Sequence, residues 1–345
     1  MGTAPTTRDE VPADVIGLSD LVVTTESSDP VVILRGVSLT VRAGELVGLV
    51  GESGSGKSTV ALAIADLLPE GVVRASGSVR VNGEALDALP AKRRGALLGR
   101  KVALVLQDPS ASLNPVRRIG PQMIEVLRFH FGVSRAEALR LAADRLREVG
   151  IDDPGRVLAS YPDMLSGGMK QRVVIAMGLL AGPEVVIADE PTTALDVRVQ
   201  ASVLDLLVRL NSEKDVAILL VSHNIVAVGE YCDRVIVMYA GTIVESLAAA
   251  DLMASARHPY TRALIGSVPS LETPTQAELP TIPGSPPDPG DVLAGCPFEP
   301  RCPLARARCA TELPRRIALD ESHTVACWAV EEELAQHPVR LEPSC

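Results

Sequence analysis

Short apolar runs separated by turn residues occupy the chain between residues 16 and 50. The runs span residues 16–24, 31–34, 37–41 and 46–50, and the pairs Asp29-Pro30 and Ala43-Gly44 stand between them. Runs of this length with Pro, Gly and Asp at their ends are typical of strands joined by tight turns. We therefore predict a β-rich opening that ends at Val50.

Further strand patterns are distributed along the chain as far as residue 245. They cover residues 77–83, 101–106, 185–189 and 216–221, followed by a hairpin of 235–239 and 241–245. The first of them ends in an Asn-Gly turn. The runs that begin at Val185 and Val216 are almost entirely apolar, which predicts strands that are buried on both faces.

The stretch between residues 110 and 163 has the periodicity of helices instead. Ser134 and Glu137 have the spacing of a capping box, and Gly150 ends the periodic segment. One apolar stripe runs along this segment: Leu139, Ala142, Leu146 and Val149. Together with the strands on either side, this helical stretch predicts an α/β fold.

At 345 residues the chain is long enough for one full core with an appendage. We predict a disordered polar leader over residues 1–15, a main domain over 16–268, and a linker with a C-terminal extension over 269–345. Seven of the residues from Pro269 to Pro289 are proline, which predicts little regular structure there. No apolar run approaches the roughly 18 residues that span a bilayer, and no export signal follows Met1.

Charge and aromatic content limit the partners of the chain. The formal net charge is −10 and aromatic residues make up 2% of the sequence. Nonspecific nucleic-acid binding depends on positive charge, and base stacking depends on aromatic rings. We therefore expect no nucleic-acid partner.

A glycine-rich segment, Gly51-Glu-Ser-Gly-Ser-Gly-Lys57-Ser58, lies between the apolar run 46–50 and a helix-compatible run over 59–68. It has the GxxxxGK[ST] pattern in the strand–loop–helix context that this pattern requires. Its glycines let backbone N–H groups turn toward phosphate oxygens, and the helix N-terminus adds partial positive charge. Lys57 is expected to contact the β- and γ-phosphates, and the Ser58 hydroxyl to ligate Mg²⁺. The segment predicts nucleoside triphosphate binding, but alone it fits kinases, GTPases and many ATPases.

A second segment narrows the choice of protein class. Leu165-Ser166-Gly167-Gly168-Met169-Lys170-Gln171 precedes the apolar run 173–180. Such a sequence predicts another helix N-terminus with exposed amides, which is a second anion site.

Single polar residues follow several of the predicted strands. Gln107 comes after the strand over 101–106, Asp189 and Glu190 end the run from Val185, and His223 comes after the run from Val216. Asp189 is placed to hold the Mg²⁺ shell, and Glu190 to act as the general base toward water. Each residue taken alone is weak support for a site, because polar residues are ordinary at strand ends.

Five of the six cysteines fall in the last fifth of the chain. Those at 296, 302, 309 and 327 are separated by five, six and seventeen residues. Zinc sites favour closely paired cysteines, which these gaps do not supply. Four thiolates with more variable spacing suit an iron–sulfur cluster, and unpaired structural cysteines are a further alternative. We interpret Cys232 and Cys345 as bystanders, and we expect His323 to be a surface residue.

In this order, the segments resemble the ATP-binding-cassette (ABC) family. The resemblance covers roughly residues 16–330, and it is closest to the ATP-binding subunits of oligopeptide and dipeptide importers, a branch that also includes nickel uptake systems. Support for the branch comes from residues 107–115 (Gln-Asp-Pro-Ser-Ala-Ser-Leu-Asn-Pro), Tyr161-Pro, His258-Pro-Tyr-Thr-Arg and the cysteine tail. The resemblance implies a RecA-like core, an antiparallel β subdomain, a helical subdomain inserted at about 108–180, and a Cys-rich C-terminal extension.

The resemblance also implies a role for each site residue. ATP would be bound by Gly51, Ser53, Gly54, Ser55, Gly56, Lys57, Ser58 and Thr59. Ser58, Gln107 and Asp189 would hold Mg²⁺, while Glu190, His223 and Gln107 would carry catalysis. Ser166, Gly167 and Gly168 would close over the ATP bound by a partner cassette, and Asp196 would lie in the loop that crosses to it. The cysteine tail, Cys296, Cys302, Cys309 and Cys327, would hold a [4Fe–4S] cluster, with zinc as the alternative.

The chain departs from the family at the adenine end of the site. Family members place an aromatic residue near the end of the first strand, yet no Phe, Tyr or Trp precedes Phe129. We therefore expect aliphatic contacts to adenine, for example from Val32 or Ile33.

The expected function is ATP hydrolysis that powers oligopeptide or dipeptide uptake, from the cytoplasmic face of the cell membrane. The family implies these partners: a second, different cassette chain, two transmembrane permease subunits and an extracytoplasmic peptide-binding protein. The alternatives are an importer of nickel or another small solute, an exporter cassette, and a non-transport ABC ATPase.

Overall fold

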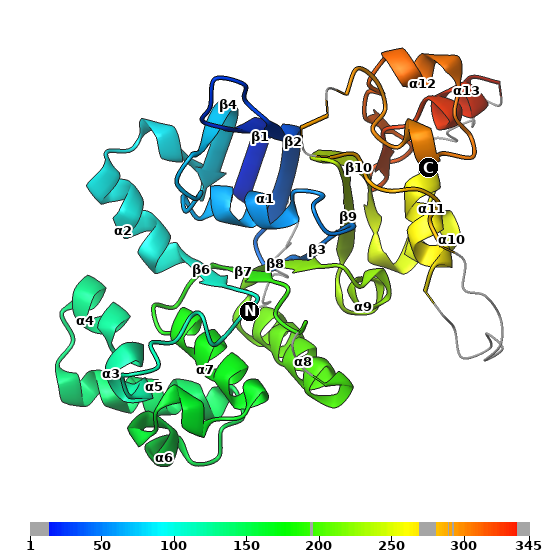
Figure 1. Ribbon diagram of the computed structural model, residues 1–345. Helices are drawn as coiled ribbons and strands as arrows, with labels where there is room; N and C mark the ends of the chain where they lie inside the picture. The colour runs from blue at the N-terminus through cyan, green and yellow to red at the C-terminus, as the bar shows by residue number, and fades with distance from the viewer. Residues whose placement is uncertain (1–13, 194–195, 269–280, 289, 292, 337–345) are drawn as a thin grey trace, which may run out of the picture.

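The computed structural model describes residues 14–193, 196–268, 281–288, 290–291 and 293–336. Most of the predicted leader and linker, and Cys345, lie outside the described residues. Two sheets form the frame, and helices surround the larger one (Figure 1). No described helix combines the length and apolar character that a membrane crossing would require.

The opening strands form a four-stranded antiparallel sheet in the order β2-β1-β4-β5. Its members are β1 (Asp14–Thr25), β2 (Val32–Arg42), β4 (Val72–Val81) and β5 (Glu84–Ala85). Inward residues such as Ile16, Leu18 and Val79 are buried, and their neighbours along the strand are more exposed, as one-sided packing requires. The predicted β-rich opening is confirmed, with the first strand starting at Asp14.

The larger sheet has eight strands in the order β11-β12-β10-β9-β3-β8-β7-β6. Its parallel part comprises β3 (Leu46–Val50), β6 (Val102–Val105), β7 (Val185–Asp189), β8 (Ala217–Ser222) and β9 (Arg234–Tyr239). An antiparallel edge adds β10 (Thr242–Ala248), β11 (Ile317–Ala318) and β12 (Thr324–Val325). Every residue of β3 and β7 is buried, which explains their nearly unbroken apolar sequence.

One face of this sheet packs on α1 (Lys57–Ile64), which lies between the two sheets (Figure 1). The other face packs on α7 (Gly167–Leu179), α8 (Val197–Lys214) and α9 (Ile225–Tyr231). The helical stretch predicted between the phosphate loop and the Ser-Gly-Gly segment forms a lobe that shares one hydrophobic core with α7 and the sheet. It contains α3 (Ile119–Met123), α4 (Glu125–Phe131), α5 (Arg135–Glu148) and α6 (Pro154–Ala159), while α2 (Ala91–Lys101) leads from β5 to β6.

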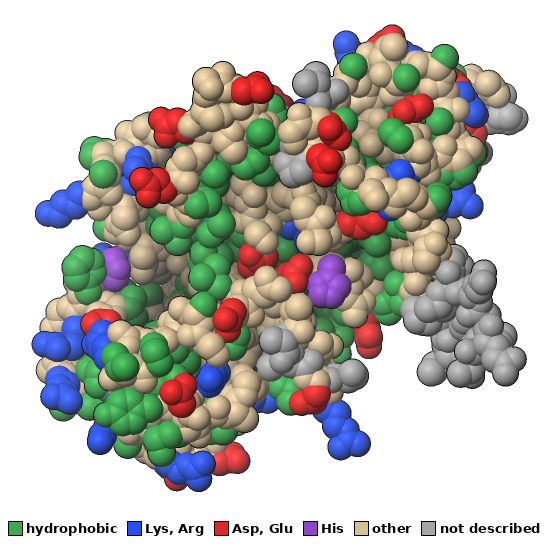
Figure 2. Space-filling model, viewed as in Figure 1, with side chains coloured by type: hydrophobic (Ala, Val, Ile, Leu, Met, Phe, Trp, Pro, Cys, Tyr) green, Lys and Arg blue, Asp and Glu red, His purple; other side chains and the backbone are tan. Residues whose placement is uncertain are grey.

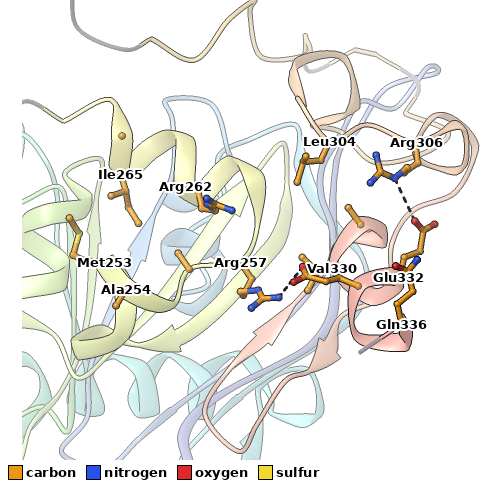
Figure 3. Close-up of a pocket in the computed structure, with 14 residues that line it drawn as sticks. Met253, Ala254, Arg257, Arg262, Ile265, Leu304, Arg306, Val330, Glu332 and Gln336 are labelled. Carbon is orange, nitrogen blue, oxygen red and sulfur yellow. Dashed lines mark ion pairs between the residues drawn. The ribbon is translucent and has the colours of Figure 1, made fainter. Parts of the chain in front are cut away.

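The described residues after 280 pack on the rest of the chain instead of standing apart from it. We call residues 281–288, 290–291 and 293–336 the C-terminal segment; it contains α12 (Ala307–Thr311) and α13 (Trp328–Gln336). Its strand β12 pairs with β10 at Glu245 and Ser246. It also faces α10 (Leu252–Ser255) and α11 (Pro259–Gly266), and the ion pair between Arg257 and Glu333 (3.0 Å) joins the two sides (Figure 3).

Candidate functional site

The phosphate-binding loop connects β3 to α1, as the sequence predicts. Lys57 begins α1, and its Nζ donates to the carbonyl oxygens of Gly51 (2.8 Å) and Glu52 (2.9 Å). Gly56 has φ +98, and a Cβ there would lie 2.7 Å from Leu34 Cδ2, so only glycine fits. Burial lowers the pKa of Lys57, and the neighbouring carboxylates oppose that shift. The ammonium group is therefore held inside the loop beside the position for phosphates.

Ser58 and Asp189 meet at the next position of the site. The Ser58 hydroxyl donates to Asp189 Oδ1 over 3.1 Å, although the two residues come from α1 and the end of β7. Burial raises the pKa of Asp189, which the Ser58 hydrogen bond only partly offsets. A hydroxyl and a carboxylate oxygen are hard donors of the kind that Mg²⁺ prefers. These two residues therefore fit the Mg²⁺ that the family implies.

Three polar side chains converge on the Glu190 carboxylate. Its Oε2 accepts from Gln107 Nε2 (3.2 Å) and from Thr193 Oγ1 (2.8 Å), and His223 Nδ1 lies 3.3 Å away. Glu190 itself has φ +47, a strained conformation for a residue with a side chain. Thr193 was not among the residues predicted from the sequence. The feature that could have indicated it is its position three residues after Glu190.

Lys57, Ser58 and Glu190 line a cavity of about 640 Å³, whereas Asp189, Thr193 and His223 are not part of its wall. Figure 2 shows acidic side chains and a histidine together in the hollow between the helical lobe and the sheets. Val32 and Ile33 line the cavity, as do Gln107 and Glu190. The C-terminal segment contributes Pro287, Asp288 and Leu293 to the same wall.

A second cavity of about 700 Å³ lies between α10, α11 and α13 (Figure 3). None of the residues predicted to bind or hydrolyse nucleotide lines it. The residues predicted to bind nucleotide therefore lie at the cavity beside the phosphate loop, not at this one.

The Ser-Gly-Gly segment lies at the N-terminus of α7, where it lines a depression of its own. Ser166 Oγ caps the helix by accepting from the Met169 amide over 3.3 Å. Gly168 packs closely on α8, and a Cβ at this position would lie only 2.7 Å from Val199 Cγ1. Asp196, which caps α8, lines the same depression as Ser166. The fold thus brings Asp196 and the Ser-Gly-Gly segment together, but it does not bring them to Lys57 of the same chain.

The four tail cysteines come together in the C-terminal segment. The Cys296 amide donates to the Cys309 carbonyl over 2.7 Å, and burial, with smaller effects of the other three thiols, raises the pKa of Cys296 to about 12. In the described part of the chain, however, no three His, Cys, Asp or Glu side chains are arranged to hold a metal ion. Cys232 lies apart from these cysteines, under β3.

His323 is not the surface residue that the sequence suggested. It is 6% exposed, and its Nε2 lies 2.9 Å from Oε1 of the fully buried Glu245. The prediction was wrong because a polar residue between turns carries no signal of a partner 78 positions away.

Comparisons with known proteins agree with this geometry. Residues 34–193 match the family "ABC transporter", and residues 244–309 match "Oligopeptide/dipeptide transporter, C-terminal region". A probable peptide ABC transporter ATP-binding protein, y4tR of Sinorhizobium fredii, is 46% identical over 87% of this chain and 90% of its own length. The oligopeptide transport ATP-binding protein OppD of Salmonella typhimurium is 42% identical over 94% of this chain and 96% of its own. The dipeptide transport ATP-binding protein DppD of Bacillus subtilis is 40% identical over 89% of this chain and 91% of its own length.

Solved structures share the cassette fold. The dimeric post-hydrolysis cassette MJ0796, bound to ADP and Pi, superposes with a TM-score of 0.61 at 26% identity. The match covers 68% of this chain and 98% of that one. On the sequence matches and this fold, the chain belongs to the ABC transporter family, among the ATP-binding proteins of oligopeptide and dipeptide transport.

Proposed function

We propose that this chain hydrolyses ATP to power the import of oligopeptides or dipeptides, bound peripherally at the cytoplasmic face of the membrane. One observation carries the ATPase part: Lys57 and Ser58 at the start of α1 and Glu190 at the end of β7 line one cavity, and Ser58 hydrogen-bonds Asp189 beside it. The peptide part is supported by relatives named for peptide transport and by the match over residues 244–309.

Hydrolysis would follow from the groups around the cavity. Lys57 and the loop amides bind the β- and γ-phosphates, with the lysine exchanging its carbonyl partners for phosphate oxygens. Mg²⁺, held by Ser58 and Asp189 with Gln107 completing the set, would neutralise phosphate charge. Glu190 accepts the proton of the attacking water, and its contacts with Gln107, Thr193 and His223 orient the carboxylate.

We further propose that the site is completed by a second, different cassette chain. Ser166, Gly167 and Gly168 lie in a depression separate from the cavity of Lys57, so within one chain they have no nucleotide to cover. In a head-to-tail pair, the exposed amides of each α7 would bind the γ-phosphate on the opposite chain, and Asp196 would lie at the crossing. Two permease subunits and an extracytoplasmic peptide-binding protein would complete the importer.

For the tail cysteines we propose a [4Fe–4S] cluster. The support is chemical: four thiols are gathered within one small segment, where the other three lie near enough to Cys296 to affect its pKa. Cysteine ligands of a four-iron cluster each bind a different iron, so they lie farther apart than the ligands of a single zinc ion.

Uptake measurements test the transport function. A host that lacks this chain would be complemented with wild type, Lys57→Ala or Glu190→Gln, and given labelled oligopeptides, dipeptides or nickel. We expect wild type alone to restore peptide uptake. Loss of the general base in Glu190→Gln should lower the rate of ATP turnover by about 10²–10⁴-fold. Restoration of nickel uptake without peptide uptake would refute the substrate class, and an active Glu190→Gln would refute the base.

A further inference from the structure

Arg301 belongs to the C-terminal segment, between two of the tail cysteines, yet its side chain ends at the phosphate-binding loop. Its guanidinium is almost fully buried, with 4% of the side chain exposed. Nη1 and Nη2 donate to the two carboxylate oxygens of Glu52 over 2.7 and 3.1 Å. Bidentate pairs of this kind are among the strong and directional hydrogen bonds of proteins.

Glu52 is the second residue of the phosphate-binding loop, and it is tied to the rest of the site through its backbone. Its carbonyl accepts from Lys57 Nζ over 2.9 Å, and its amide donates to the hydroxyl of Tyr260 over 2.8 Å. Any shift of Glu52 would therefore move the carbonyl that holds the phosphate-binding lysine.

The position of Arg301 is fixed on the remaining sides as well. Nη1 also donates to the Tyr239 hydroxyl over 3.1 Å, and the Tyr239 ring packs against Tyr260 and Phe298 with centroids 4.6 and 5.3 Å away. Because the guanidinium is anchored from several directions, it can act as a rigid support for the loop.

The same guanidinium holds the part of the C-terminal segment that reaches the nucleotide cavity. Nε donates to the Pro283 carbonyl over 2.8 Å and Nη2 to the Ile282 carbonyl over 3.3 Å. A few residues later, Pro287 and Leu293 line the cavity beside the phosphate loop.

We propose that Arg301 is a positioning residue of the ATP site, which holds the phosphate-binding loop through Glu52 in its nucleotide-ready conformation. The C-terminal segment is then a structural part of that site. Without Arg301 the competent loop is a smaller fraction of the unliganded population, and the apparent affinity for ATP falls by that fraction. Once ATP has ordered the loop, the chemical step proceeds with the same groups.

The kinetic test uses the assembled transporter with Arg301→Met in this chain. Loss of a charge-assisted pair predicts a rise of about ten- to hundredfold in KM for ATP, with kcat changed much less. Arg301→Lys should recover only part of the lost apparent affinity for ATP, because lysine keeps the charge but cannot make the bidentate contact. Arg315→Met, an exposed arginine of the same segment, is the matched control and should leave KM unchanged.

A double-mutant cycle with Glu52→Gln tests the partner. If Arg301 acts through Glu52, the double variant is no worse than the more affected single variant, whereas fully additive effects would overturn the assignment. Hydrogen exchange in the nucleotide-free protein gives a readout that needs no activity. Arg301→Met should speed exchange of the 51–58 amides and leave α5 unchanged. Unchanged exchange of the 51–58 amides together with an unchanged KM for ATP would refute the proposal. Failure of peptide uptake alone would bear only on the transport function.

Discussion

His258 provides a prediction about pH that can be worked out from its surroundings. It is 2% exposed at the start of α11, where Nδ1 accepts from the Tyr260 amide over 3.1 Å. Its ring also hydrogen-bonds the backbone of Ala326 in the C-terminal segment. Burial lowers the pKa of His258 to about 4, despite the opposing pull of Glu245.

The sign and size of the effect follow from linkage. The folded protein keeps this ring neutral down to about pH 4, whereas in the unfolded chain it binds a proton near pH 6.5. The group therefore contributes stability that is present above pH 6.5 and is lost as the pH falls toward 4. Between pH 7 and pH 5 the loss is about 2 kcal/mol of unfolding free energy.

Urea unfolding of wild type and His258→Asn at pH 7 and pH 5 measures this contribution. Asparagine retains a capping oxygen but has no titrating ring, so wild type should lose about 2 kcal/mol more than the variant over this range. Leu264→Ala, on the same helix, controls for general destabilisation and should keep the wild-type pH dependence. If wild type and His258→Asn lose equal stability, the buried neutral ring is not the cause and the reasoning fails.

Three further predictions concern packing, the partner and the tail. Gly48→Ala places a Cβ 1.9 Å from Val228 Cγ1 and should lower the free energy of unfolding in urea by about 1–3 kcal/mol. Adding Val228→Ala to this variant should recover much of the lost stability, and no recovery would contradict the clash. Asp196→Ala and Asp153→Ala each remove an N-cap and should cost about 1 kcal/mol, but only the first should slow ATP turnover of the assembled transporter. Equal turnover of the two would argue against a role of Asp196 at the crossing. Anaerobically purified protein should carry about four iron atoms with acid-labile sulfide, and zinc without iron would contradict the cluster.

Much of the candidate nucleotide site could be predicted because it depends on local order along the chain. Gln107, Glu190 and His223 each follow a parallel strand, and β6, β7 and β8 are neighbours in the sheet. Parallel strands present their carboxyl ends at one edge, so residues that follow them meet there. The phosphate-binding loop needs only its own pattern and the flanking strand and helix.

The contribution of the C-terminal segment could not be predicted in the same way. Arg301 and Glu52 are 249 positions apart, and nothing in either local sequence indicates the other. The strands β11 and β12 have two residues each, too short for an alternating pattern to be recognised. The pairing of β12 with β10 and of β11 with β12 is set by tertiary packing, and so are the buried contacts of His323 and Arg301.

The central claim is that this chain supplies one half of each of two nucleotide sites. A structure of the assembled transporter with Glu190→Gln in this chain, loaded with ATP and Mg²⁺, tests it most directly. We predict ATP at Lys57 covered by the partner chain, with Ser166 and Gly168 of this chain against the γ-phosphate of the partner's nucleotide. An ATP-loaded assembly in which Ser166 faces no nucleotide would contradict it.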